Sequence, residues 1–206
     1  MLTRVLMLWA LNKTAATFQL SDVVISARGS KTARLRASDG AADVIYSTAN
    51  NGLCAPFGPG NFDKNAPATR MNLAVRLDDE ADLAFFDKLD EWAVTYIAEN
   101  AERLFKRTMT QEQVTSGYHP CVRRKDGYAP LLHTKINSEG PTALRCWDAE
   151  GAVRAQPTEW ARTRLQLRFR VSHLWIMGSA FGLVVNTSDA KVLSEADAAS
   201  EWTCPF

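Results

Sequence analysis

Residues 165–185 read LQLRFRVSHLWIMGSAFGLVV, and this stretch decides the fold. Its first half alternates apolar residues with polar ones that include Arg168 and Arg170. Such alternation predicts a half-buried β-strand, with one face in the core and arginines on the other. A glycine turn follows, and the apolar residues after it predict a partner strand. We therefore expect a closing β-hairpin over residues 162–177 and 181–193.

Shorter apolar runs bounded by Gly, Pro, Asn and Asp predict further strands along the chain. One segment differs, because apolar residues recur every three or four positions from about Asp79 to Arg107 and predict one long α-helix. Many short strands with glycine turns are typical of a sandwich or barrel. We expect a mainly β chain, a barrel with one long inserted helix at about residues 79–107. The other strands are expected at 17–27, 32–37, 44–48, 69–77, 117–127, 128–137 and 142–148, with a loop at 50–67.

Charge is unevenly distributed along the 206 residues, although the net charge is only +1. Residues 77–102 carry nine acidic residues against one lysine, whereas residues 103–170 carry thirteen basic residues against six acidic ones. With 46% apolar and 23% charged residues the composition is that of a globular domain and not of a disordered chain. The basic middle predicts a polyanionic partner, and we expect the acidic C-terminal region to compete with that partner or to serve as a docking segment.

Cysteine spacing and hydropathy bear on the compartment. The four cysteines, at positions 54, 121, 146 and 204, form no Cys-x-x-Cys pair, so we expect a reducing intracellular compartment such as a nucleus, a viral replication site or an organelle. No apolar run reaches the length of about 18 residues that a membrane span needs. Residues 1–16 are an apolar N-terminal extension, which we interpret either as a targeting leader or as a first structural element.

Motifs for catalysis are absent from the sequence. It has no Gly-x-Ser-x-Gly, no His-Glu-x-x-His and no phosphate-binding glycine loop, so we expect no enzyme activity and no cofactor. A zinc site could draw on four residues of the central strands, but their spacing is not a known ligand pattern, and buried core cysteines are the favoured interpretation. Those four residues are His119, Cys121, His133 and Cys146.

A group of carboxylates leaves a metal-dependent nuclease as one alternative. Four of its five members begin the predicted helix, where acidic residues favour the positive end of the helix dipole. We therefore interpret them as a solvated helix face with no metal. The five are Asp63, Asp78, Asp79, Glu80 and Asp82.

The chemistry for binding single-stranded nucleic acid is present, since such binding needs cations for the phosphates and flat side chains for the bases. Arg123, Arg124 and Lys125 are expected at the tip of a hairpin that Tyr118 and Tyr128 flank. The alternative is that these basic residues only prevent the edge strands of the sheet from pairing with other chains. Trp175 lies in a run of four apolar residues, and we favour the core for it over the binding surface. The candidate binding residues are Tyr118, Arg123, Arg124, Lys125, Tyr128, Lys135, Trp147, Arg168 and Arg170.

Four stretches, in this order, carry a resemblance. They are GLCAPFGPGNFD before RMNLAVRL, then FFDKLDEWAVTYIAEN, then YHPCVRRKDGYAPLLHTKI, and last LRFRVSHLWIMGSAFGLVVNTSDAKVL, which together span about residues 52–193. The chain resembles the single-stranded DNA-binding proteins of large DNA viruses of algae and protists, which are related to the OB-fold binding proteins of podophages. No single motif is diagnostic; the order and spacing of the four stretches carry the resemblance.

The resemblance implies an OB-fold-like domain at residues 17–193 that coats single-stranded DNA in replication, recombination or repair. It also implies that the acidic, Phe-terminated tail, residues 194–206, docks replication proteins through Trp202 and Phe206. The tail departs from the family pattern, because it has only three acidic residues and because Trp202 and Cys204 are unusual there.

A rival from another class is a structural or assembly protein with a β-barrel fold, for which the helix would be an assembly surface. The sequence does not decide between DNA and RNA, because a contact to the 2′-hydroxyl leaves no pattern. It leaves the oligomeric state open as well.

Overall fold

The closing hairpin is the longest element of the sheet. It consists of β11 (Arg164–Met177) and β12 (Ala180–Ser194), which pair antiparallel from Arg164↔Ser194 to Met177↔Ala180. Gly178 adopts a φ of 62°, which favours glycine, and so makes the tight turn between them. The predicted hairpin is therefore present over nearly the predicted residues.

The computed structural model describes residues 18–27, 29–37, 44–48, 52–61, 69–157, 159–161 and 163–194. Strands in these ranges join into one 12-stranded sheet, and none of the described helices is long and apolar enough to cross a membrane. The remaining strands are β1 (Phe18–Leu20), β2 (Val24–Ile25), β3 (Lys31–Ala37), β4 (Val44–Ser47), β5 (Leu53–Cys54), β6 (Arg70–Arg76), β7 (Val122–Arg123), β8 (Leu131–Asn137), β9 (Arg145–Trp147) and β10 (Val153–Arg154).

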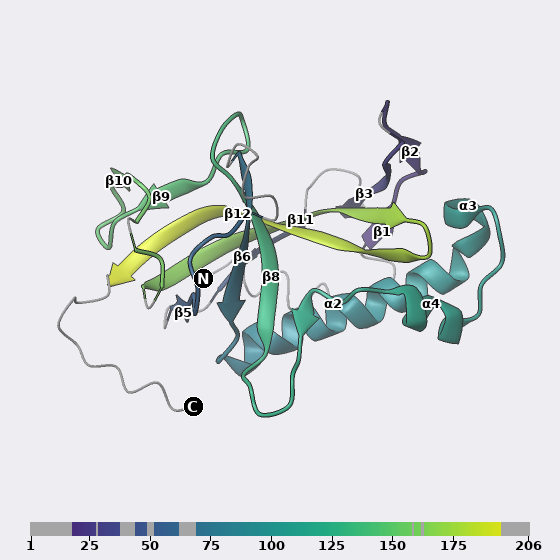
Figure 1. The fold of residues 1–206 in the computed structure, drawn as a ribbon, viewed down its shortest axis with the longest axis horizontal. Coiled ribbons are helices and arrows are strands. Elements are labelled where there is room, and N and C mark those ends of the chain that lie inside the picture. The colour runs from purple at the N-terminus through teal and green to yellow at the C-terminus, as the bar shows by residue number, and fades with distance from the viewer. Residues whose placement is uncertain are drawn as a thin grey trace.

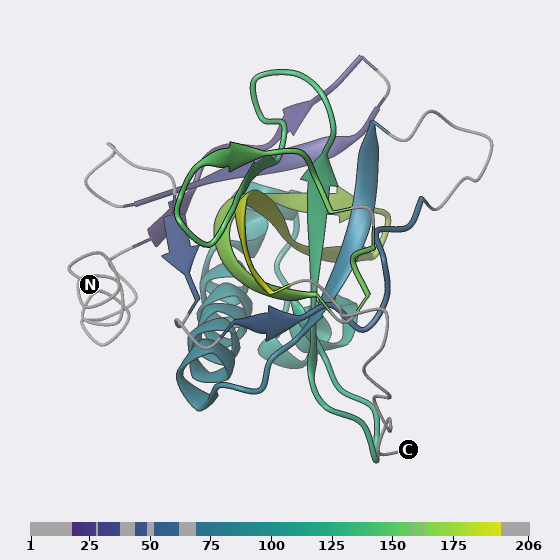
Figure 2. The same ribbon diagram turned by 90° about the vertical axis from the view of Figure 1, so that its left-hand side faces the viewer.

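The sheet closes on itself through five strands. β11 pairs with β5, β5 with β6, β6 with β8, β8 with β12, and β12 returns to β11. Beyond β5, the same edge of β11 pairs with β4 and then with β3. β12 pairs in parallel with β8 and β9. Figure 2 shows the curved β11–β12 pair surrounded by the other strands. The predicted mainly β, OB-fold-like barrel is confirmed.

The helical segment is longer and more divided than the single helix predicted. α2 (Glu80–Glu99) is followed by α3 (Ala101–Phe105) and α4 (Gln111–Gly117). Asn100 ends α2 because its backbone leaves the helical region, and its side-chain amide donates to the Tyr96 carbonyl at 2.9 Å. In Figure 1, α2 runs along the β11–β12 pair, and α3 and α4 lie near its turn.

The core lies between α2 and the sheet. Phe85, Phe86 and Phe169 are fully buried there, and the Tyr46 ring stacks on Phe85 with centroids 3.9 Å apart. Asp82 is also fully buried, and it accepts a hydrogen bond from the Tyr46 hydroxyl. The interpretation of the acidic residues as a solvated helix face is therefore wrong for Asp82, which joins α2 to β4.

Three other sequence predictions differ from the structure. The strand expected at 17–27 is interrupted, because residues 21–23 leave the sheet between β1 and β2. The loop expected at 50–67 contains the short strand β5, which closes the barrel. The strand expected at 117–127 shrinks to β7, because Gly117 belongs to α4 and residues 126–127 form a turn.

We predict that Tyr46→Phe lowers the free energy of unfolding by about 1–3 kcal/mol, because it leaves the buried Asp82 carboxylate without one of its donors. Urea denaturation measures the change. Tyr128→Phe is the matched control, because Tyr128 is 55% exposed and its substitution should shift stability by less than about 0.5 kcal/mol. Equal stabilities for the two variants would contradict the prediction.

Candidate nucleic-acid interface

Residues from β3, β6, β7, β8, β11 and β12 line an open hollow of about 610 Å³, which we call the barrel groove. Its walls carry four cations, three histidines and one tryptophan. These residues are Lys31, Arg70, Arg123, Lys135, His119, His133, His173 and Trp175.

A second hollow, of about 400 Å³, continues the barrel groove, and we call it the side pocket. The two hollows share Arg70 and His173, and the side pocket adds Arg145 and Arg170. Among the described residues that line either hollow, none is Asp or Glu. The result is one continuous surface with six cations, to which the described part of the chain contributes no carboxylate.

The alternation of β6 and β8 explains how two strands supply this surface. Leu73 and Val75 point into the core, so Arg70 and Asn72 point outward to the groove. In the paired register Asn72 lies opposite Lys135, and the Lys135 ammonium donates to the Asn72 side-chain oxygen. This contact fixes the Lys135 side chain across the groove.

A β-bulge supplies the residues from β11. The register with β12 shifts between Val171 and His173, and Ser172 and His173 are consecutive half-exposed residues. The shift places His173 and Trp175 in the groove, while Leu174 and Ile176 stay buried. Trp175 is therefore a half-buried residue in the groove wall, although the apolar run around it favoured a place in the core.

The Trp175 ring has an aromatic neighbour. The His119 ring lies 5.5 Å from it, centroid to centroid, at 49°. The backbone N–H of His119 donates to the Phe181 carbonyl at 2.8 Å, and a Cβ at Gly182 would lie 2.5 Å from the His119 carbonyl oxygen. Only glycine at 182 lets the segment approach so closely, and the two rings are thereby held at one end of the groove.

The positive potential of the groove is reflected in its titrating groups. Burial, then Arg123 and Lys135, lowers the pKa of His133. Burial and the nearby Arg70 likewise lower the pKa of His173, and burial with Arg70 and Arg123 lowers that of Lys135. Each neighbouring cation disfavours a further positive charge, so the groove is poised to accept an anion.

Three of the nine predicted binding residues line the hollows, and the other six do not. Arg123, Lys135 and Arg170 line the continuous surface. Arg168 is exposed on β11 but lines neither hollow. Trp147 is half-buried, and its indole N–H donates to Asp189 at 3.2 Å while Asp189 also pairs with Arg145 at 2.8 Å.

The tip of the β7–β8 hairpin lies apart from the groove lining. Arg124 donates twice to the Asp87 carboxylate of α2, at 2.6 and 2.7 Å. The Lys125 ammonium lies 4.9 Å from the centroid of the exposed Tyr128 ring. These three predicted residues therefore contact their own chain and line neither hollow.

Tyr118 does not lie on the surface. Its side chain is only 8% exposed, and its hydroxyl donates to Asp90 of α2 at 2.6 Å. Asp90 also accepts from the backbone N–H of Cys121 at 2.9 Å, and burial raises its pKa. Tyr118 has no exposed ring face for a base, so we correct its assignment from binding residue to core residue.

Sequence reasoning missed Lys31, Arg70 and His173 as groove residues. The alternation in RMNLAVRL did place Arg70 on the polar face, and only the pairing with β8 was needed to bring it to Lys135. The bulge that exposes His173 and Trp175 has no signal in the sequence.

Three of the five carboxylates considered for a nuclease have structural roles. Asp78 pairs with Arg76 at 2.8 Å, Asp79 caps α2, and Asp82 is buried against Tyr46. Within the described ranges, no group of three or more His, Cys, Asp or Glu residues could hold a metal ion. Asp63, Trp202, Cys204 and Phe206 lie outside the described residues.

No protein-family model matches the chain, and no curated protein matches it. Among solved structures, it is similar to the single-stranded DNA-binding protein from bacteriophage Enc34 in complex with single-stranded DNA (TM-score 0.44, 8% identity, 88% of this chain and 96% of that chain covered). It is also similar to gp2.5, a single-stranded DNA-binding protein encoded by bacteriophage T7 (TM-score 0.46, 12% identity, 79% and 96% covered). The resemblance to proteins of large DNA viruses of algae and protists stays a prediction.

Proposed function

We propose that the chain binds single-stranded DNA along the barrel groove and the side pocket, with little sequence preference and without catalysis. The observation that carries the proposal is the continuous surface of six cations beside a half-buried Trp175, with no Asp or Glu among the described residues that line it. One of these cations, Arg145, also pairs with Asp189 at 2.8 Å. Phosphates would meet the cations, and bases would stack on Trp175 and His119.

The geometry favours a single strand over a duplex. Trp175 and the three histidines lie in the walls of the hollow, where only unpaired bases can turn toward them. A duplex presents its phosphates outward and keeps its bases stacked, so it would meet the cations but offer no base to the aromatic rings. Stacking on a flat ring tolerates every base, which is why we propose little sequence preference.

We further propose that binding serves DNA replication, recombination or repair, and that the C-terminal tail docks partner proteins through Trp202 and Phe206. Both follow from the resemblance of the sequence. A homo-oligomer is compatible with the proposal, because neither hollow depends on a second copy.

Titration of the purified protein into labelled oligomers of about 30 nucleotides tests the ligand, since one OB fold covers about 4–16 nucleotides. Single-stranded DNA, single-stranded RNA and duplex DNA are compared at two salt concentrations. We expect salt-sensitive binding that is tightest for single-stranded DNA. Tighter binding to RNA would make RNA the proposed ligand. If no oligomer binds, the proposed function is wrong, and an assembly protein becomes the favoured alternative.

We predict that Arg70→Ala with Arg123→Ala weakens binding and lowers the slope of log K against log salt by about 1.4, since each phosphate contact to a single strand contributes about 0.7. The matched control is Arg124→Ala with Lys125→Ala, which removes the same charge from the hairpin tip. We expect the control to keep the wild-type slope. An equal loss in both double variants would place the ligand on the hairpin and not in the groove.

We predict that affinity rises as the pH falls from about 7.5 to about 5.5 at constant ionic strength. Burial and neighbouring cations lower the pKa of His133 and His173 in the free protein, and a bound phosphate would raise both. The complex then binds more protons than the free protein, so acid favours binding. His133→Gln with His173→Gln should flatten the profile, and a wild-type affinity independent of pH would contradict the assignment.

We predict that removal of residues 201–206 leaves the affinity for single-stranded DNA within about twofold of wild type, because a docking segment contacts partners and not the groove. The same titration measures it. Loss of affinity on truncation would show that the tail contributes to binding DNA, and the docking proposal would fall.

A further inference from the structure

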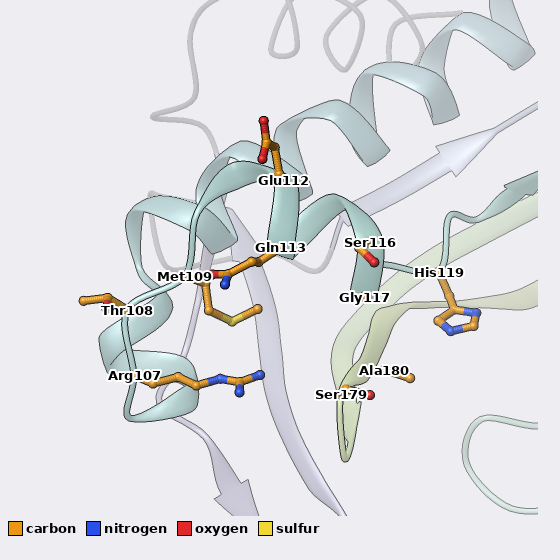
Figure 3. Close-up of a pocket in the computed structure, with 10 residues that line it drawn as sticks. All are labelled: Arg107, Thr108, Met109, Glu112, Gln113, Ser116, Gly117, His119, Ser179 and Ala180. Carbon is orange, nitrogen blue, oxygen red and sulfur yellow. The ribbon is translucent and has the colours of Figure 1, made fainter.

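A third hollow, of about 550 Å³, lies between α4, the segment before it and the β11–β12 turn, and we call it the helix pocket. Figure 3 shows its walls, with Arg107 and Met109 on one side and Ser116, His119 and Ser179 on the other. The proposed DNA path along the groove does not use it.

His119 belongs to both the helix pocket and the barrel groove. The border between the two hollows is closely packed, because two glycines without a Cβ lie in it. A Cβ at Gly117 would lie 2.6 Å from the Ser179 carbonyl oxygen, and one at Gly182 would lie 2.5 Å from the His119 carbonyl oxygen. Because His119 lines both hollows, a ligand that stacks on its ring in the groove lies next to the helix pocket.

The lining of the helix pocket suits the backbone of a nucleic acid. Arg107 is exposed and supplies a guanidinium for a phosphate, and Ser116 and Ser179 supply hydroxyls. The Gln113 side-chain oxygen accepts from the Thr110 backbone N–H at 2.9 Å, so its amide N–H groups remain to donate. Met109 adds an apolar contact for a base or sugar.

One acidic residue lines the helix pocket, in contrast to the groove. Glu112 lies in the first turn of α4, and in Figure 3 its carboxylate points away from the Arg107 side chain. Its negative charge would repel a phosphate bound in the pocket, so removing this charge should tighten binding.

We propose that a bound single strand continues from the barrel groove past His119 into the helix pocket, where Arg107 holds one of its phosphates. This rests on the proposed function and extends it: the binding site comprises three hollows in series, so the protein occludes more nucleotides than the groove alone. Arg107 then contributes only to oligomers long enough to pass His119.

The experiment compares Arg107→Ala with Lys106→Ala, across single-stranded oligomers from about 4 to about 20 nucleotides. The two variants remove the same charge from adjacent positions, but Lys106 lines a different hollow, at α3. We expect Arg107→Ala to weaken binding of long oligomers about three- to tenfold, lower their salt slope by about 0.7, and leave the shortest oligomers unaffected. Lys106→Ala should match wild type at every length.

Glu112→Gln is expected to change affinity in the opposite direction. A misfolded variant would not bind more tightly, so this result would not be explained by loss of folding. It should tighten binding of the long oligomers about twofold and leave the short ones unchanged. If Arg107→Ala binds oligomers of every length like wild type, or if Lys106→Ala has an equal effect, the proposed contact in the helix pocket is wrong. The proposal that DNA binds in the barrel groove would not be affected. Failure of the wild-type protein to bind any oligomer would overturn the proposed function itself.

Discussion

Hydrogen bonding along both edges of β11 is the constraint on which the rest of the structure depends. One edge carries β12 over the full length of the strand, and the other carries β5, β4 and β3 in succession. Closure of the barrel requires this shared strand, and the bulge near Ser172 is tolerated because both edges hold the strand on either side of it. The same bulge turns His173 and Trp175 outward, so the groove is a consequence of how the barrel closes.

Gathering six cations, with no Asp or Glu among the described residues that line the surface, costs electrostatic free energy. Asp189 offsets part of that cost by pairing with Arg145 at 2.8 Å, and the groove limits the rest in two ways. The Lys135 ammonium is held by the neutral Asn72 oxygen, which leaves its charge available to a ligand. Burial and the neighbouring cations lower the pKa of His133 and His173, which favours the neutral imidazoles and so limits the repulsion. A polyanion would relieve the remaining repulsion, and a neutral ligand would not.

The sequence predicted the elements better than the site. The alternation of apolar and polar residues around Phe169 and Leu73 predicted the hairpin and β6 correctly. On a half-buried strand, buried and exposed side chains alternate, so the sequence itself shows which residues are buried. The interface depends on register, and register appears only when strands pair: Arg70 reaches Lys135 through β8. Tyr118 was misassigned for the related reason that its partner, Asp90, lies 28 residues earlier in the chain, on α2.

The most basic stretch of the sequence illustrates the difference between charge and available charge. Arg124 is held by Asp87 at 2.6 Å, so a phosphate at this position would have to compete with a carboxylate already bound. The Asp90 carboxylate accepts a hydrogen bond from the backbone N–H of Cys121 in the same segment. Asp87 and Asp90 both belong to α2. The acidic face of the helix thus fixes the start of the β7–β8 hairpin and leaves Arg123, at its base, directed to the groove. Helix and hairpin together decide which of three consecutive cations is free to meet a ligand.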